Sequence, residues 1–168
     1  INTLLSGLLV SSRVCVIIPT VDNSEELAVA LDGLACQTFK DMEVVVVGPG
    51  GDSGKSVTEN RGIRFIDDRG SRSRADACNI AIRETESDLI FFTDDDVIVP
   101  HDWIERLERW FKRPEVSGVG GPNFAPVDES TILQQSIDVA FCNKILTAGT
   151  NYGSMTSEEL EEVEQLPG

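Results

Sequence analysis

Three consecutive aspartates, Asp94 to Asp96, follow the short apolar segment Leu89–Thr93. Such a segment, rich in aromatic and branched residues, predicts a buried strand of a parallel sheet. Side chains directly after such a strand lie at the carboxyl edge of the sheet, where open α/β folds bind ligands. Three neighbouring carboxylates repel one another, and a hard cation such as Mg²⁺ or Mn²⁺ would relieve that repulsion. The triplet therefore indicates a metal site, with a solvated acidic turn as the alternative.

A second segment that could bind a ligand is the glycine-rich loop Gly48–Ser56, which follows the predicted strand Glu43–Val47. A phosphate-binding loop needs a glycine, four further residues and then Gly-Lys-Ser/Thr, so that backbone N–H groups surround the phosphate. Counting back from Gly54 places Pro49 where the first glycine should be, and counting from Gly48 leaves one residue too many. An NTPase with the aspartates holding Mg²⁺ is therefore an alternative, and a plain turn is the simpler interpretation.

The elements that must position these residues alternate along the chain. Strands are predicted at residues 14–18, 43–47, 64–66, 89–93 and 116–121, and helices from the 22–24 cap to 36 and at 73–84, 103–112 and 131–146. Ser73 is the expected cap of one helix, and Asp102 with Glu105 forms a capping box for another. Alternating strands and helices predict a parallel sheet with right-handed crossovers. The acidic tail at 154–165 predicts an exposed helix without a catalytic role.

The composition narrows the class of protein. The 168 residues and the hydrophobic content of 40% predict a globular domain with a real core. The net charge of −15 argues against nucleic acid as a partner, since phosphate binding needs clustered basic residues. The same charge weakens attraction to anionic lipid. The acidic excess suits a halophilic source and an ordinary acidic protein equally well.

The cysteines and the ends of the chain also allow predictions. The cysteines are Cys15, Cys36, Cys78 and Cys142, without a CxxC pair. They are predicted to be reduced core residues of a cytosolic protein. The apolar stretch Ile1–Val10 is too short for a membrane span and lacks the basic flank of a signal peptide. Because the chain begins with Ile and stops at Gly168, we expect a fragment.

Five segments, in order between about residues 13 and 125, resemble family 2 glycosyltransferases of GT-A fold. The segments are Val14–Thr20, Gln37–Val47, Arg74–Ile82, Asp88–Asp96 with Pro100, and Gly118–Pro122. The resemblance implies an α/β, Rossmann-like GT-A domain with a mostly parallel sheet flanked by helices. It divides the chain into an apolar segment (1–13), a nucleotide-sugar-binding core (14–125), and a helix, loop and acidic C-terminal helix (126–168).

The resemblance also implies roles for individual residues. Asp94 and Asp96 are the expected ligands of Mn²⁺ or Mg²⁺, and Asp94 also faces the ribose. Asp95 belongs to the nucleotide-sugar site but, as the middle residue, is expected to point away from the metal. Arg74 is expected to approach the phosphates. The residues expected to line the base pocket are Pro19, Thr20 and Asp22.

Two departures from the family pattern matter. The family carries an aspartate directly after the second strand that pairs with the base, whereas this chain has Gly48 and Pro49 there, which makes Asp52 the expected substitute. No counterpart of the catalytic base is recognised, so the catalytic residue is unknown. The available carboxylates after the core are Asp128, Asp138 and the glutamates of the tail.

The predicted activity is metal-dependent, inverting hexosyl transfer from a UDP- or GDP-linked sugar. The acceptor is unknown, and a lipid-linked or polysaccharide glycan is expected. The predicted location is cytoplasmic, at the membrane face in the full-length protein. The alternatives are a P-loop-like NTPase acting through Gly48–Ser56 and a non-catalytic nucleotide-binding fragment. Because no base is found, we expect this chain to bind nucleotide sugar but to transfer sugar slowly or not at all.

Overall fold

The computed structural model describes residues 13–21, 24–50, 53–121 and 131–141. These residues fall into two compact units, divided between Arg106 and Leu107, and each unit is described by itself. In the described part of the chain, no helix combines the length and the apolar character that a membrane crossing requires.

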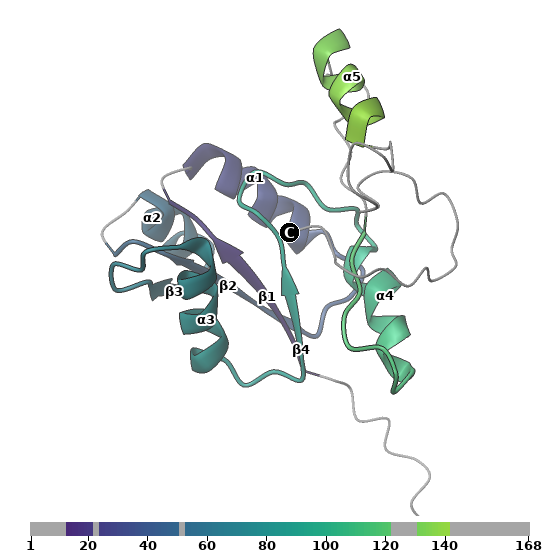
Figure 1. Ribbon diagram of the computed structural model, residues 1–168. Coiled ribbons are helices and arrows are strands. Elements are labelled where there is room, and N and C mark those ends of the chain that lie inside the picture. The colour runs from purple at the N-terminus through teal and green to yellow at the C-terminus, as the bar shows by residue number, and fades with distance from the viewer. Residues whose placement is uncertain (1–12, 22–23, 51–52, 122–130, 142–168) are drawn as a thin grey trace, which may run out of the picture. The chain divides into compact units, whose positions relative to one another are not determined.

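The first unit is built on a four-stranded, all-parallel sheet with the strand order β3-β2-β1-β4 (Figure 1). The strands are β1 (Val14–Pro19), β2 (Met42–Gly48), β3 (Arg64–Asp67) and β4 (Leu89–Phe92). All four were predicted, and the α/β class is confirmed. Residues 14–18 of β1 are fully buried because both faces and both edges of this strand are covered, which explains their unbroken apolar character.

Helices cover both faces of the sheet. Alternate residues of a strand point to opposite faces, so Cys15, Ile17 and Val45 share one face, where they pack with Ala77 and Ala81 of α3 (Arg74–Glu84). The other face receives α1 (Ser24–Ala35) and the short α2 (Ser53–Glu59). The α1 residues buried there are Leu27, Ala30, Leu31 and Leu34.

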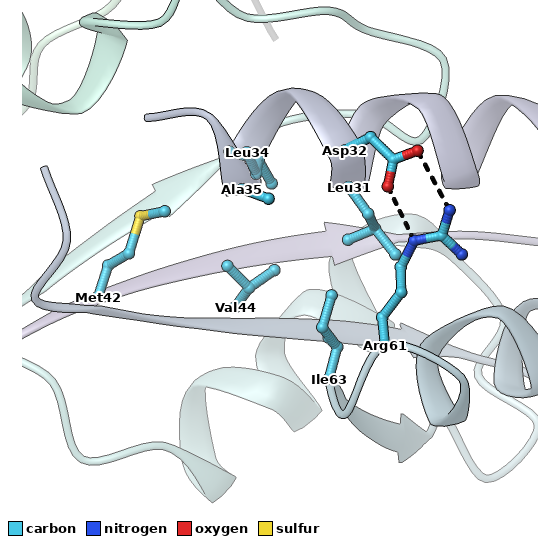
Figure 2. Close-up of a pocket in the computed structure, with 8 residues that line it drawn as sticks. All are labelled: Leu31, Asp32, Leu34, Ala35, Met42, Val44, Arg61 and Ile63. Carbon is cyan, nitrogen blue, oxygen red and sulfur yellow. Dashed lines mark hydrogen bonds and ion pairs between the residues drawn. The ribbon is translucent and has the colours of Figure 1, made fainter. Parts of the chain in front are cut away.

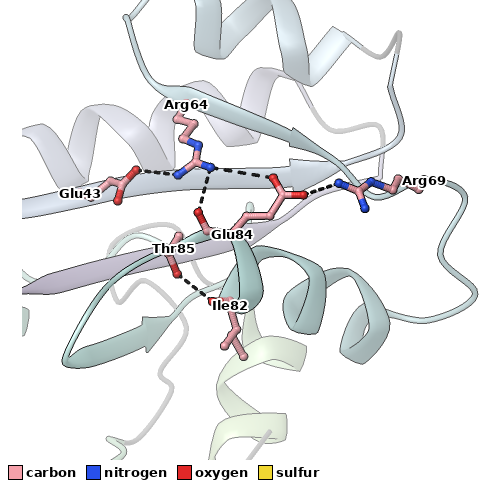
Figure 3. Close-up of polar contacts among 6 residues, drawn as sticks. All are labelled: Glu43, Arg64, Arg69, Ile82, Glu84 and Thr85. Atoms are coloured by element: carbon pink, nitrogen blue, oxygen red, sulfur yellow. Dashed lines mark hydrogen bonds and ion pairs between the residues drawn. The ribbon is translucent and has the colours of Figure 1, made fainter.

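Two features orient α3 so that its first turn lies at the carboxyl edge of the sheet. At the first turn, the Ser73 hydroxyl accepts a hydrogen bond from the Asp76 backbone N–H at 3.1 Å, which confirms the predicted cap. At the last turn, Arg64 of β3 donates to the Glu84 carbonyl at 2.9 Å and to Glu43 of β2 at 3.3 Å, and Arg69 pairs with the Glu84 carboxylate (Figure 3). Both ends of α3 are therefore tied to the sheet or to the loop that follows β3.

A buried glutamine joins α1 to α4 (Trp103–Glu108). Gln37 is fully buried, donates to the Pro100 carbonyl at 2.6 Å and accepts from the Ile104 N–H at 3.2 Å. The predicted capping box of α4 is not formed. The Glu105 carboxylate accepts from the Thr38 hydroxyl at 2.8 Å, and Asp102 binds Arg106 at 2.6 Å. Each carboxylate thus binds a partner other than the backbone N–H groups of the capping box, and Asp102 Oδ1 has no hydrogen-bond partner among the described residues.

The second unit differs more from the expectation. The predicted helix at 103–112 continues beyond α4 as a 3₁₀ helix, η1 (Arg109–Lys112), in which the Arg109 guanidinium lies 5.0 Å from the centre of the Trp110 ring. The predicted strand at 116–121 is wrong, because these residues form neither a strand nor a bridge. Three of the six are glycines, which weaken a strand. Helix α5 (Ile132–Phe141) confirms the first part of the helix predicted at 131–146.

The cysteines are only partly core residues. Cys15 is buried in β1, Cys78 is half-buried and Cys36 is exposed at the end of α1, which corrects the prediction that all are buried. Each of these three is a free thiol, as predicted. Cys142 lies outside the described residues, as do the N-terminal segment before residue 13 and the tail.

Candidate functional site at the carboxyl edge of the sheet

The strand order identifies where a ligand can bind. The chain runs outward from β1 through β2 to β3 and then returns to the other side of β1 as β4, so the order reverses between β1 and β4. Open α/β sheets bind ligands at the carboxyl ends of the strands at such a switch point. The residues that leave the two strands there are Thr20 after β1 and the aspartates after β4.

Thr20 connects three strands at this edge. Its backbone N–H donates to the Val47 carbonyl of β2 at 2.9 Å, and its hydroxyl donates to Asp95 Oδ2 at 2.6 Å. The side chain is only 4% exposed, so the hydroxyl has a fixed partner rather than water. Burial raises the pKa of the Asp95 carboxyl, and the Thr20 hydroxyl acts in the opposite direction by stabilising the carboxylate. Asp95 therefore points inward, to the end of β1.

Asp94 faces a cation instead. The Arg74 guanidinium, in the first turn of α3, forms an ion pair with Asp94 Oδ1. Both side chains are about half exposed, at 50% and 48%, so the pair is open to solvent and a ligand can replace either partner. The approach of Arg74 to the phosphates of a nucleotide stays a prediction.

Asp96 lies on the other side of the turn. It lines a hollow of about 300 Å³ with residues of α1, among them Glu25, Glu26 and Val29. Helices α1 and α3 cover opposite faces of the sheet, so Asp94 and Asp96 turn toward opposite faces while Asp95 lies between them. The three neighbours in sequence thus have three different surroundings.

Carboxylate oxygens are ligands that Mn²⁺ and Mg²⁺ prefer, so the donor chemistry of the triplet fits the expected metal. Over the described ranges, however, no group of three or more His, Cys, Asp or Glu side chains is arranged to hold an ion. The binding of a metal ion by Asp94 and Asp96 therefore stays a prediction. An ion bound by both would compete with Arg74 for the Asp94 carboxylate.

The expected base pocket is described in part. Pro19 is half-buried at the end of β1, next to Thr20. Asp22 and Asp52 lie outside the described residues. Gly48 ends β2 against Thr20: a Cβ at position 48 would lie 2.6 Å from the Thr20 carbonyl oxygen, so only glycine fits. The edge is therefore closely packed between β1 and β2.

Lys55, which would bind phosphate in a P-loop, is half exposed on α2 with its Nζ 3.9 Å from Glu59 Oε1. The side chain follows the helix toward its own last turn, so it is a surface residue, as expected if the loop is a plain turn.

Sequence reasoning missed two further aspartates at the same edge. Asp67 ends β3 and Asp68 follows it, and a carboxylate at the end of a strand was the available signal. The Asp68 carboxylate is 8% exposed and accepts from the Gly70 N–H and the Ser71 hydroxyl, each at 2.9 Å, so it holds the loop that leads to α3. Asp67 is exposed and accepts from the Arg69 N–H at 2.7 Å.

A hollow of about 340 Å³ lies elsewhere, between α1, β2 and the segment before β3 (Figure 2). Its walls are apolar, with Met42 and Val44 of β2 facing Leu31 of α1. Its charged residues are already paired: Arg61 donates to both oxygens of Asp32, at 3.0 and 3.2 Å, and these bonds lower the pKa of that carboxyl. Because it lies along the first half of β2 and its charges are paired, this hollow does not suit a nucleotide.

Comparison with known proteins gives a family match and a curated relative. The sequence profile of the family described as "Glycosyl transferase family 2" matches residues 15–159. An N-acetylglucosaminyltransferase of Azorhizobium caulinodans is 28% identical over 156 residues, which cover 85% of this chain and 39% of that protein. This chain thus spans about two fifths of the length of that relative.

Two solved structures share the fold. The first is the mannosyltransferase PcManGT of Pyrobaculum calidifontis in complex with GDP-Man and Mn²⁺, with a TM-score of 0.52 and 24% identity over 57% of this chain and 33% of that one. The second is glucosyl-3-phosphoglycerate synthase of Mycobacterium tuberculosis in complex with UDP, with a TM-score of 0.51 and 14% identity over 82% of this chain and 52% of that one.

Proposed function

Because the chain belongs to glycosyl transferase family 2, we propose that it forms the nucleotide-sugar-binding part of a metal-dependent, inverting glycosyltransferase. The donor is a UDP- or GDP-linked hexose, and the acceptor is a glycan on a lipid carrier or a polysaccharide. The enzyme works in the cytoplasm, at the membrane face in the whole protein. The mannosyltransferase with GDP-Man and Mn²⁺ and the synthase with UDP support this class of donor.

One observation carries the proposal: an arginine and a turn of three aspartates meet at the switch point of the sheet. Arg74 provides a positive charge at the first turn of α3, next to Asp94. A diphosphate leaving group gains negative charge as the bond to the sugar breaks, and a guanidinium stabilises that charge. A metal ion held by Asp94 and Asp96 would supply further stabilisation.

The other residues at this edge bind the nucleotide or hold the aspartate turn in place. Thr20 holds the Asp95 carboxylate, which fixes the turn between the two expected metal ligands. Pro19, which is half-buried at the end of β1, forms the floor on which the nucleoside lies. In the described part of the chain, no carboxylate is marked by its surroundings as the base that deprotonates the acceptor hydroxyl. The base is therefore left unassigned.

Calorimetry with UDP and GDP, with and without Mn²⁺, tests the proposal. We expect Mn²⁺ to tighten nucleotide binding at least tenfold, because its charge lies between carboxylates and phosphate oxygens. Asp96→Ala should remove most of that gain. Glu59→Ala, which deletes an exposed carboxylate on α2, is the matched control and should keep it. Equal affinities in the wild type and Asp96→Ala would overturn the proposal.

A further inference from the structure

The described side chains of the loop after β2 cannot form a hydrogen bond that distinguishes one nucleobase from another. Gly48 has no room for a Cβ, since that atom would lie 2.6 Å from the backbone oxygen of Thr20. Pro49 and Gly50 carry no hydrogen-bonding side chain. Over residues 48–50, a base could therefore meet only backbone groups. Among the described residues, a polar side chain that discriminates between bases then comes from a neighbouring strand.

The neighbouring strand places a carboxylate at this point. Asp67 is the register partner of Gly48 in the parallel pair of β2 and β3. Its Oδ2 lies 2.1 Å from the position that a Cβ of Gly50 would occupy, so the carboxylate fills the space that a side chain of the loop would take. Gly50 thus leaves room for Asp67.

The Asp67 carboxylate is held in place by one oxygen, and the other has no hydrogen-bond donor among the described residues. Oδ1 accepts from the Arg69 N–H at 2.7 Å, and Arg69 adopts a positive φ of 56°, which is uncommon for a residue with a side chain. The buried Asp68 fixes the same loop through Gly70 and Ser71. Among the described residues nothing donates to Oδ2, and the side chain is exposed to a ligand.

The spacing between the strand ends suits a nucleotide that lies along the carboxyl edge of the sheet. Neighbouring strands lie about 4.8 Å apart, so the end of β3 is about 14 Å from the end of β4. A nucleoside diphosphate with its phosphates beside Arg74 and the aspartates after β4 lies across the ends of β1 and β2. Its base then reaches the end of β3, where Asp67 stands.

We propose that Asp67 selects the base of the nucleotide sugar, accepting a hydrogen bond from a ring N–H with its free oxygen. This inference rests on the proposed function. An ionised carboxylate only accepts hydrogen bonds. Uracil and guanine present a ring N–H on the edge that pairs with other bases. Cytosine and adenine present a ring nitrogen with a lone pair at that place, which the carboxylate repels.

The test compares the affinities of UDP, GDP, CDP and ADP for the wild type and for Asp67→Asn, with Mn²⁺ present. The wild type should bind UDP or GDP at least tenfold more tightly than CDP and ADP, since a hydrogen bond to a charged group is involved. Asp67→Asn should reduce that ratio about tenfold, because the amide also donates. Glu59→Gln, which loses the same charge on α2, should leave the ratio unchanged.

A second measurement needs no variant. Methylation of the ring nitrogen removes the donor, so N3-methyl-UDP, or N1-methyl-GDP if guanine is preferred, should bind the wild type about tenfold more weakly than the parent nucleotide. Equal affinities for methylated and parent nucleotides, or an unchanged base ratio in a folded Asp67→Asn variant, would overturn the assignment of Asp67 while leaving the proposed function intact. A wild type that binds none of the four nucleotides would overturn both.

Discussion

Thr20 and Asp95 are 75 residues apart in the sequence, yet the Thr20 hydroxyl donates to the Asp95 carboxylate at 2.6 Å. This bond joins the carboxyl ends of β1 and β4 at the place where the strand order reverses. The two side chains therefore fix the turn that carries Asp94 and Asp96.

Thr20→Val should therefore weaken both stability and metal-assisted binding. The substitution keeps the shape of the side chain and removes the donor, which leaves a partly buried carboxylate without its partner. We expect unfolding to become easier by about 1–2 kcal/mol and the gain in nucleotide affinity from Mn²⁺ to fall. Thr38→Val removes the exposed bond to Glu105 and is the control, with a smaller effect. Equal losses of stability in the two variants would argue against a special role for Thr20.

Arg74→Gln should have opposite effects on two ligands. UDP or GDP should bind about tenfold more weakly, since a charged donor to phosphate is lost. Mn²⁺ alone should bind up to about fivefold more tightly, because Asp94 loses a competing cation in a solvent-exposed pair. Calorimetry measures both. Arg72→Gln replaces an exposed arginine two residues before Arg74 and should change neither. A loss of nucleotide affinity as large as that of Arg74→Gln would indicate a general charge effect.

Lys55→Ala should leave UDP, GDP and ATP affinities within about twofold of the wild type. Its Nζ pairs with Glu59 along an exposed helix, so only a weak surface ion pair is lost. Fluorescence or calorimetric titration provides the measurement. A large loss specific to triphosphates would restore the NTPase interpretation of the glycine-rich loop.

Gly48→Ala should be strongly destabilising. The new Cβ would lie 2.6 Å from a backbone oxygen, so β1 and β2 must move apart at their carboxyl ends. We expect a loss of about 1–3 kcal/mol in the free energy of unfolding. Gly33→Ala is the matched control in α1, where the nearest atom is 3.9 Å away, and it should be neutral or stabilise by about 0.5–1 kcal/mol. Urea denaturation of both variants decides the comparison.

Cys15 should make the protein less stable in alkali. Burial raises the pKa of its thiol to about 11, whereas the unfolded thiol ionises near its usual pKa of about 8.5. Between these values the unfolded state releases a proton that the folded state keeps, so stability falls as pH rises. Cys15→Ala should lower overall stability and reduce the loss between about pH 9 and pH 10 by about 1 kcal/mol. An unchanged pH slope would contradict the buried, protonated thiol.

The sequence predicted the parts of this fold that follow from local pattern. β1 is a continuous apolar segment because it is central, and Ser73 is a recognisable cap because its hydroxyl serves the first turn of α3. The four strands at the centre and the switch-point location of the aspartates could therefore be anticipated. The alternation of elements also predicted a strand at 116–121, and the glycine-rich backbone there, with glycines at 118, 120 and 121, does not form one.

Contacts between distant segments could not be predicted in this way. Gln37 looks like an ordinary polar residue at a helix end, and only the fold shows that it bridges to Pro100 and Ile104. Asp67 is inconspicuous in an acidic chain until strand register places it opposite Gly48. The directions of Asp94, Asp95 and Asp96 depend on partners in α3, β1 and α1, which no local pattern encodes.

The pairing of β1 with β4 also has a consequence for how the protein acquires its site. β1 is the first strand of the sheet, but its second neighbour is the last, so the intervening chain must be closed into a long loop before the two can join. Parallel pairings between remote segments form slowly. During synthesis, the half of the sheet from β1 to β3 can assemble early, while the joint between Thr20 and Asp95 must wait until Asp95 has been made. Nucleotide-binding competence should thus appear late, as the closing step of folding.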